Sequence, residues 1–210
     1  MGSKERRERE RADTRQRILD AARDMFVERG YEATTMRAIA ARVEYTPTAI
    51  YHHFRNKEAL ITELCTLDFR SLAQRFIRIE KVPDPIERIG RLGEAYVEFA
   101  IAHPNHYQLM FMTPRPPASQ DLVDAMKGDP SEDAYALLRE TCVDAIESGL
   151  LRPELTDPDE LAQILWSALH GLVSLRIIKT HDAWLEWGDV RRTAGRVREI
   201  LIRGMRRDPS

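Results

Sequence analysis

The chain has 210 residues, 43% of them hydrophobic, so it can bury a core and form one large or two small domains. Its formal net charge is only −2, but residues 1–60 hold 13 Lys and Arg against 10 Asp and Glu, and the remainder is acidic. A mildly basic N-terminal segment in an otherwise acidic chain is consistent with nucleic-acid binding at one end. Charge alone does not establish this, because so small an asymmetry also arises by chance.

Several protein classes are disfavoured by composition. Cys65 and Cys142 are too few and too isolated for a disulfide framework or a zinc site. The N-terminal segment is charged and has no apolar run, so we expect no signal peptide. Polar residues such as His170 and Arg176 interrupt the longest apolar region, residues 161–178, so we expect no membrane span and a cytoplasmic protein.

Residues 1–12 alternate acidic and basic side chains without an apolar position, which predicts a disordered, solvated tail. The arginines that could instead reach a minor groove or DNA phosphates are Arg6, Arg7, Arg9 and Arg11. The interleaved glutamates cancel much of this charge and favour the solvated tail. A helix is expected to begin at Asp13 or Thr14 and to end at Gly30.

Residues 34–60 contain two short helical patterns joined by a few residues. Thr35 is expected to cap the first helix and Thr46 the second, with Pro47 in the first position of the second helix. A helix this short is not stable alone and must be held by its neighbours. A rigidly held short helix with small polar residues at its N-terminal end is suited to a major groove, so the pattern predicts a helix-turn-helix.

The second short helix has a buried and an exposed side. Ile50 and Phe54 repeat at a spacing of four and predict the buried side. The residues left facing elsewhere are Pro47, Thr48, Tyr51 and His52.

The spacing Y-x-x-F-x-x-K-x-x-L, formed by Tyr51, Phe54, Lys57 and Leu60, follows this two-helix unit. With the preceding stretch TRQRILDAARDMFVERGYEATTMRAIAARV, it resembles the N-terminal DNA-binding domain of the TetR family of transcriptional regulators. The resemblance covers residues 12–62 nearly continuously. One position departs, because members usually carry Gly in the turn where this chain has Glu44. A left-handed Glu costs about 1 kcal/mol more than Gly, so the turn could take a different shape.

The resemblance implies an all-α fold with two parts. The first is a three-helix helix-turn-helix domain at residues 13–60. The second is a larger C-terminal helical domain at residues 81–210 for ligand binding and dimerisation. A linking helix is expected over residues 56–80, because Asn56 is a good N-cap and an apolar stripe runs to about Glu80.

The C-terminal region reads as further helices. Two prolines mark residues 81–85 as a connector, and three exclude regular structure from residues 113–119. Ser131 is expected to cap a helix that stops at Gly149. Residues 157–178 form a helix that is apolar nearly all round, and residues 190–205 form a final helix with one apolar stripe. Two such helices from each subunit could form a four-helix interface, which predicts a homodimer.

The W-x-x-x-H-G spacing of Trp166, His170 and Gly171, with HPNHYQLMF at residues 103–111, resembles the WHG-type subgroup of TetR ligand-binding domains. A large apolar lining with a few polar groups is typical of a pocket for a hydrophobic small molecule. The candidate lining residues are Tyr96, Phe99, Tyr107, Met110, Phe111, Trp166 and His170. Each of them alone is more simply a core residue, so the prediction concerns the set.

Metal and catalytic chemistry have little support. His103 and His106 lie three residues apart, but no Cys or carboxylate follows at ligand spacing and Pro104 disrupts the helix that would align them. Neither Ser nor Cys stands in a nucleophile motif. We therefore expect no metal, no cofactor and no enzyme activity.

The expected function is a ligand-responsive transcriptional repressor that binds a palindromic operator in double-stranded DNA as a homodimer and is released by a hydrophobic small molecule. The residues expected at phosphates are Thr35, Thr46, Tyr51 and Lys57, and those expected at bases are Pro47, Thr48 and His52. For Tyr51, packing within the small domain is an equal alternative. The alternative functions are a helical protein-interaction module and a helical enzyme that transforms small molecules.

Overall fold

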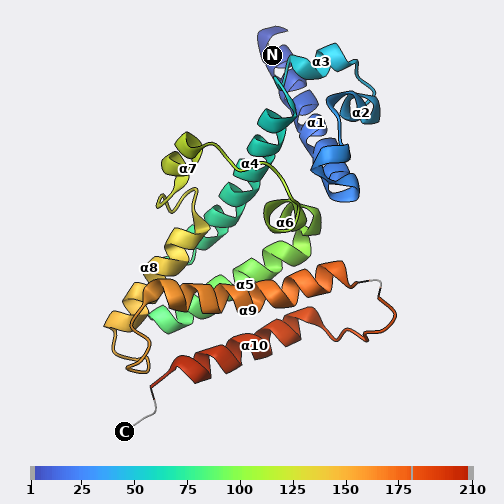
Figure 1. The fold of residues 1–210 in the computed structure, drawn as a ribbon. Helices are drawn as coiled ribbons and strands as arrows, with labels where there is room; N and C mark the ends of the chain where they lie inside the picture. Colours follow the sequence, from blue (N-terminus) through green and yellow to red (C-terminus); the bar gives the residue numbers. More distant parts are fainter. Residues whose placement is uncertain (1–2, 181, 208–210) are drawn as a thin grey trace. The chain divides into compact units, whose positions relative to one another are not determined.

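The computed structural model describes residues 3–180 and 182–207. In this part of the chain the regular structure is α-helical, which confirms the expected all-α fold (Figure 1). The helices are α1 (Ser3–Ala33), α2 (Met36–Arg42), α3 (Pro47–Tyr51), α4 (Lys57–Ile77), α5 (Pro85–Ala102), α6 (Pro104–Phe111), α7 (Gln120–Met126), α8 (Ala134–Glu147), α9 (Pro158–Ile178) and α10 (Val190–Met205).

The helices divide into two compact units. Unit 1 comprises the residues up to 68 together with 105–119, and unit 2 comprises 69–104 and 120–210. Helix α4 begins in unit 1 and continues into unit 2. We expected residues 81–210 to form one C-terminal domain, whereas residues 105–119, with nearly all of α6, group with the helix-turn-helix unit.

Helix α1 begins at Ser3 and not at Asp13 or Thr14, so residues 3–12 are helical where we expected a disordered tail. Residues 1–2 lie outside the described part of the chain. The charges that suggested a tail recur at a spacing of four, which places opposite signs together on a helix surface. Lys4 Nζ lies 3.9 Å from Glu8, and Arg6 Nε lies 2.8 Å from Glu10.

The first helix, which we expected to end at Gly30, is interrupted there and continues to Ala33 beyond the kink. Gly30 has φ 80° and ψ 167°, a conformation that is essentially restricted to glycine. The buried hydroxyl of Thr34 has one proton to donate and lies within hydrogen-bond distance of two carbonyl oxygens, those of Met25 at 3.1 Å and Gly30 at 2.8 Å. Thr34 therefore ties the residues after the kink to the helix before it.

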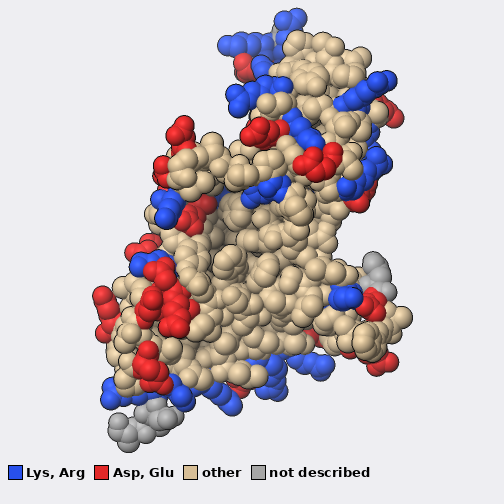
Figure 2. All heavy atoms as spheres, viewed as in Figure 1, with Lys and Arg blue, Asp and Glu red and all other residues tan. Residues whose placement is uncertain are grey.

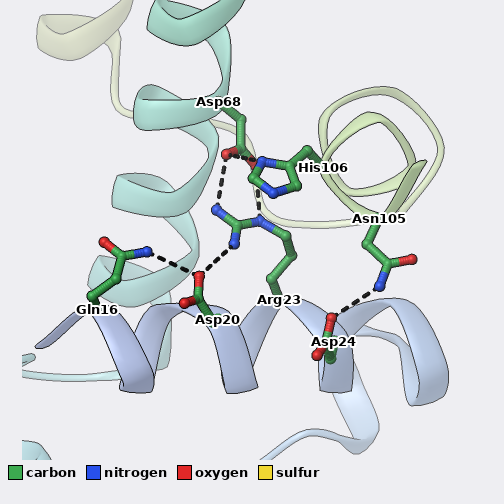
Figure 3. Close-up of polar contacts among 7 residues, drawn as sticks. All are labelled: Gln16, Asp20, Arg23, Asp24, Asp68, Asn105 and His106. Carbon is green, nitrogen blue, oxygen red and sulfur yellow. Dashed lines mark hydrogen bonds and ion pairs between the residues drawn. The ribbon is translucent and has the colours of Figure 1, made fainter. Parts of the chain in front are cut away.

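A buried polar network joins three helices of unit 1 (Figure 3). The Arg23 guanidinium of α1 donates to the Asp68 carboxylate of α4, with Nη2 2.9 Å from Oδ1. Arg23 is 5% exposed and Asp68 only 2%. His106 Nδ1 of α6 lies 2.8 Å from the same carboxylate, and Asn105 donates to Asp24 of α1 at 2.9 Å. Helix α6 is thereby bonded to both α1 and α4.

Unit 2 is built on packing among α5, α8, α9 and α10. Its buried cluster includes Ile86, Ile89, Cys142, Ala145, Leu161, Leu165 and Met205. Four of its helices begin at aspartate N-caps, which are Asp84, Asp133, Asp157 and Asp189. The prediction that Ser131 caps α8 is wrong, because the Asp133 carboxylate accepts the Tyr135 and Ala136 N–H groups at 3.0 and 3.1 Å.

Helix α9 is the one described helix that is long and apolar enough, by composition, to cross a membrane, with a mean hydropathy of 1.5. It packs in unit 2 against α5, α8 and α10. Its inward side includes Leu161, Leu169 and Val173, whereas Leu175 and Ile178 on another side are 54% and 62% exposed. One apolar side is thus in the core and a second is uncovered, as the sequence predicted.

Candidate nucleic-acid interface

Two threonine caps set the positions of the short helices. Thr35 Oγ1 accepts the Ala38 N–H of α2 at 3.1 Å, and Thr46 Oγ1 accepts the Ala49 N–H of α3 at 3.3 Å. Pro47 occupies the first turn of α3, where its missing N–H leaves no donor unsatisfied. Both predicted caps are confirmed.

The turn between α2 and α3 keeps a left-handed residue although it lacks glycine. Glu44 has φ 61°, and the following Tyr45 N–H donates to the Ala40 carbonyl at 2.9 Å. We expected that Glu44 could give the turn a different shape. Its backbone is nevertheless left-handed, as a glycine would be, and this conformation is strained for a residue with a Cβ.

Replacing Glu44 by Gly should raise the free energy of unfolding by up to about 1 kcal/mol, because the left-handed strain is removed. A thermal melt followed by circular dichroism measures the change. Glu44→Ala is the matched control, because it removes the carboxylate but keeps the strained Cβ, and it should give no comparable gain. Equal stabilisation by both variants would show that the carboxylate, and not the backbone, is responsible.

One side of helix α3 packs into the core through apolar residues, and the other side presents polar residues to solvent. Ile50 is fully buried and Phe54 is 3% exposed. The residues on the exposed side are Thr46, Pro47, Thr48, Tyr51 and His52, and Thr35 is also exposed at the start of α2. Tyr51 is 54% exposed, which argues against its packing within the small domain.

Lys57 is only half-buried and has partners within unit 1. Its Nζ donates to the Tyr31 carbonyl at 2.7 Å and lies 4.0 Å from the centre of the Tyr31 ring. Lys57 thus connects the start of α4 to the end of α1, a role that the sequence pattern did not indicate. An ammonium has three donors, so this bond leaves room for a phosphate contact.

The aromatic set is divided between the units. In unit 2, Trp166 Nε1 donates to Tyr96 Oη at 3.0 Å, and that hydroxyl lies 3.1 Å from His170 Nδ1. Burial lowers the pKa of His170, which favours the neutral imidazole. Phe99 is fully buried in the same unit. The other three candidates belong to α6 in unit 1, and they are Tyr107, Met110 and Phe111.

An N-terminal and a C-terminal segment of the sequence match different family models. Residues 18–64 match bacterial regulatory proteins of the tetR family, and residues 89–187 match the tetracyclin repressor-like C-terminal domain. The HTH-type transcriptional repressor KstR2 of Mycobacterium tuberculosis is 34% identical over 144 residues, which cover 66% of this chain and 69% of that protein. The chain belongs to the TetR family. The WHG-type subgroup stays a prediction.

Other TetR-type proteins are similar over shorter stretches or in fold. UidR of Escherichia coli is 41% identical over 76 residues, 36% of each chain. PfmR of Thermus thermophilus superposes with a TM-score of 0.72 at 23% identity, over 91% of this chain and 97% of PfmR. FadR of Bacillus halodurans superposes with a TM-score of 0.72 at 19% identity, over 90% and 95% of the two chains. At these identities the structures show the fold.

TetR-family membership establishes the coarse function. The chain is a DNA-binding transcriptional regulator and not an enzyme, which confirms both expectations and rejects the enzyme alternative. Within that function, the residues at the exposed end of α3 are the candidates for contact with DNA.

Proposed function

We propose that this TetR-family regulator is a repressor that binds a near-palindromic operator as a homodimer and is released by a hydrophobic small molecule. The exposed side of α3 carries the proposal, because it presents Thr48, Tyr51 and His52 while Ile50 is fully buried. A short helix held in this way can enter a major groove with its N-terminal residues against base edges.

The exposed residues divide by chemistry. Thr48 and His52 can exchange hydrogen bonds with bases, and Pro47 can pack on a thymine methyl group. The residues assigned to phosphates are Thr35, Thr46, Tyr51 and Lys57, through hydroxyls, helix N-termini and one ammonium. Contacts with bases set sequence preference, and contacts with phosphates set affinity and register.

Thr48→Ala should change sequence preference at one base pair of each half-site, by about 1–3 kcal/mol. Tyr51→Phe is the matched control, since it removes only a phosphate contact and should weaken binding to all duplexes alike. Competition binding against single-base variants of a selected duplex measures both. Thr48→Ala with an unchanged preference would remove Thr48 from the base readers.

The homodimer is supported by the uncovered side of α9 and by α10 beside it (Figure 1). Ile164, Leu175 and Ile178 are exposed on α9, and Ile200 of α10 is 69% exposed. Gly171 lies on the same side of α9, and a Cβ added there would meet no atom within 4 Å. A second subunit related by a two-fold axis would cover this surface and form a four-helix interface.

Two-fold symmetry determines the operator. Each subunit would place one α3 in the major groove, in half-sites about 34–36 Å apart, so the operator should be a near-palindrome. A regulator of this kind acts in the cytoplasm, where chromosomal DNA lies.

The effector is proposed to bind in unit 2 beside Tyr96, Trp166 and His170. Their hydrogen-bonded polar atoms sit among large rings, which suits a mostly apolar molecule with one or two polar groups. An apolar effector agrees with the names of two similar proteins, the ketosteroid transcriptional regulator KstR2 and the fatty acid degradation regulator FadR. Helix α4 runs from unit 1 into unit 2, so it is the continuous element through which effector binding would alter unit 1. The effector must bind one arrangement more tightly than the other.

A further inference from the structure

The first turns of α1 extend the side of that helix that faces α3. Successive residues of an α-helix turn by about 100°, so Arg7, Arg11, Thr14 and Ile18 share one side. Ile18 is fully buried in unit 1. Thr14 Oγ1 lies 3.4 Å from the hydroxyl of Tyr45, in the turn that leads into α3. The same side therefore continues from the core, past that turn, to Arg11 and then Arg7.

The neighbours of Thr14 confirm this orientation. Arg15 pairs with Glu63 of α4, and its guanidinium carbon lies 4.5 Å from the centre of the Phe54 ring. The pKa of His53, just after α3, is lowered first by burial and then by the charges of Arg11 and Arg15. Arg11 is thus close to the C-terminal end of the helix that we assign to the groove.

Arg7 and Arg11 differ from the other cations of this segment. Lys4 and Arg6 are paired with glutamates on α1 itself. Within residues 3–180 and 182–207, neither Arg7 nor Arg11 forms an ion pair, and both are exposed. Figure 2 shows Lys and Arg side chains gathered where α1 begins. Two uncompensated guanidinium groups therefore project from the side of α1 nearest to α3.

We propose that Arg7 and Arg11 bind phosphates of the DNA backbone beside the groove that α3 enters, without reading sequence. With a rise of 1.5 Å per residue, Arg11 lies about 4.5 Å and Arg7 about 10 Å beyond Thr14 along the helix. The pair therefore extends the binding surface past the end of α3. A planar guanidinium can hold a phosphate through two hydrogen bonds. The assignment relies on the proposed docking of α3.

The test compares two double variants of the full chain that remove equal charge from the same helix. Arg7→Ala with Arg11→Ala removes the cations on the α3 side. Arg6→Ala with Arg9→Ala is the matched control on other sides, and alanine preserves the helix in both. Binding to a duplex of arbitrary sequence is measured against salt concentration, so the result does not depend on a palindromic operator.

Log affinity falls as log salt rises. In the Arg7 and Arg11 variant this fall should be shallower, with the magnitude of the slope smaller by about 0.9 for each phosphate that an arginine no longer neutralises. The control should leave the slope nearly unchanged, and Arg7→Lys with Arg11→Lys should largely restore it. An equal decrease in both double variants would mean that only overall charge matters, and would overturn the assignment. A decrease that appears on one sequence only would overturn the backbone role. An unchanged slope in the Arg7 and Arg11 variant would also overturn the assignment. Absence of any sequence preference of the unmodified protein in the competition assay would instead contradict the proposed function.

Discussion

Asp68→Ala should lower the free energy of unfolding of unit 1 by up to about 3–5 kcal/mol, because it leaves the buried Arg23 guanidinium with only the exposed Asp20 carboxylate, 3.1 Å away, as counter-charge. Arg23 is 5% exposed, and its Nη2 lies 2.9 Å from the Asp68 carboxylate. The same substitution removes the Asp68 carboxylate that His106 contacts, so α6 also loses a bond to α4. Hydrogen exchange of the α1 amides, measured as urea is added, gives the destabilisation of unit 1.

The control for this prediction replaces both partners. Arg23→Met with Asp68→Leu leaves no buried charge unpaired, since Asp20 is exposed, and such exchanges are often close to neutral. The double variant should therefore be clearly more stable than Asp68→Ala. If Asp68→Ala costs less than about 1 kcal/mol, the ion pair is solvated and does not hold the three helices together.

Gly171→Lys should abolish the dimer and reduce affinity for a palindromic duplex by about 10²–10⁴-fold, because the two half-sites are then bound separately. A Cβ added at this position meets no atom within 4 Å in its own subunit, so the fold of the subunit should be kept. Lysine is also a better helix former than glycine. Analytical ultracentrifugation gives the oligomeric state, and titration of the duplex gives the affinity.

Gln163→Lys is the matched control, since Gln163 is exposed and lies about 80° around α9 from Gly171. It adds the same charge to the same helix and should leave a dimer with normal affinity. A dimeric Gly171→Lys variant would place the subunit interface elsewhere.

The helices that the sequence predicted well have local signals at their ends. Thr35, Thr46 and Asp157 each precede a helix whose first N–H groups they accept, and Gly30 takes a conformation that other residues avoid. The last helix, α10, has the predicted bounds. These signals act within a few residues and depend little on the rest of the fold.

Other features depend on contacts that no short stretch records. Arg23, Asp68 and His106 lie far apart in sequence, so nothing local indicated that α6 would bond to α1 and α4. The bond from Tyr96 to Trp166 likewise joins α5 to α9. The first turns of α1 were mispredicted for a different reason, because their alternating charges were taken as solvation and not as pairs at a spacing of four.

Site-directed cleavage beside α3 is the most direct test of the place of that helix in the groove. Both native cysteines are buried, and burial raises the pKa of Cys65 to about 11 and that of Cys142 to about 12. At pH 8 their thiols are protonated and inaccessible, so an Arg55→Cys variant, exposed just after α3 and outside the residues assigned to bases, can be labelled selectively with a DNA-cleaving chelate. On a duplex selected from random sequences, we expect cuts in two successive major grooves, symmetric about the centre of the site. Cuts in the minor groove, or cuts spread evenly along the duplex, would contradict the assignment of α3 as the reading helix.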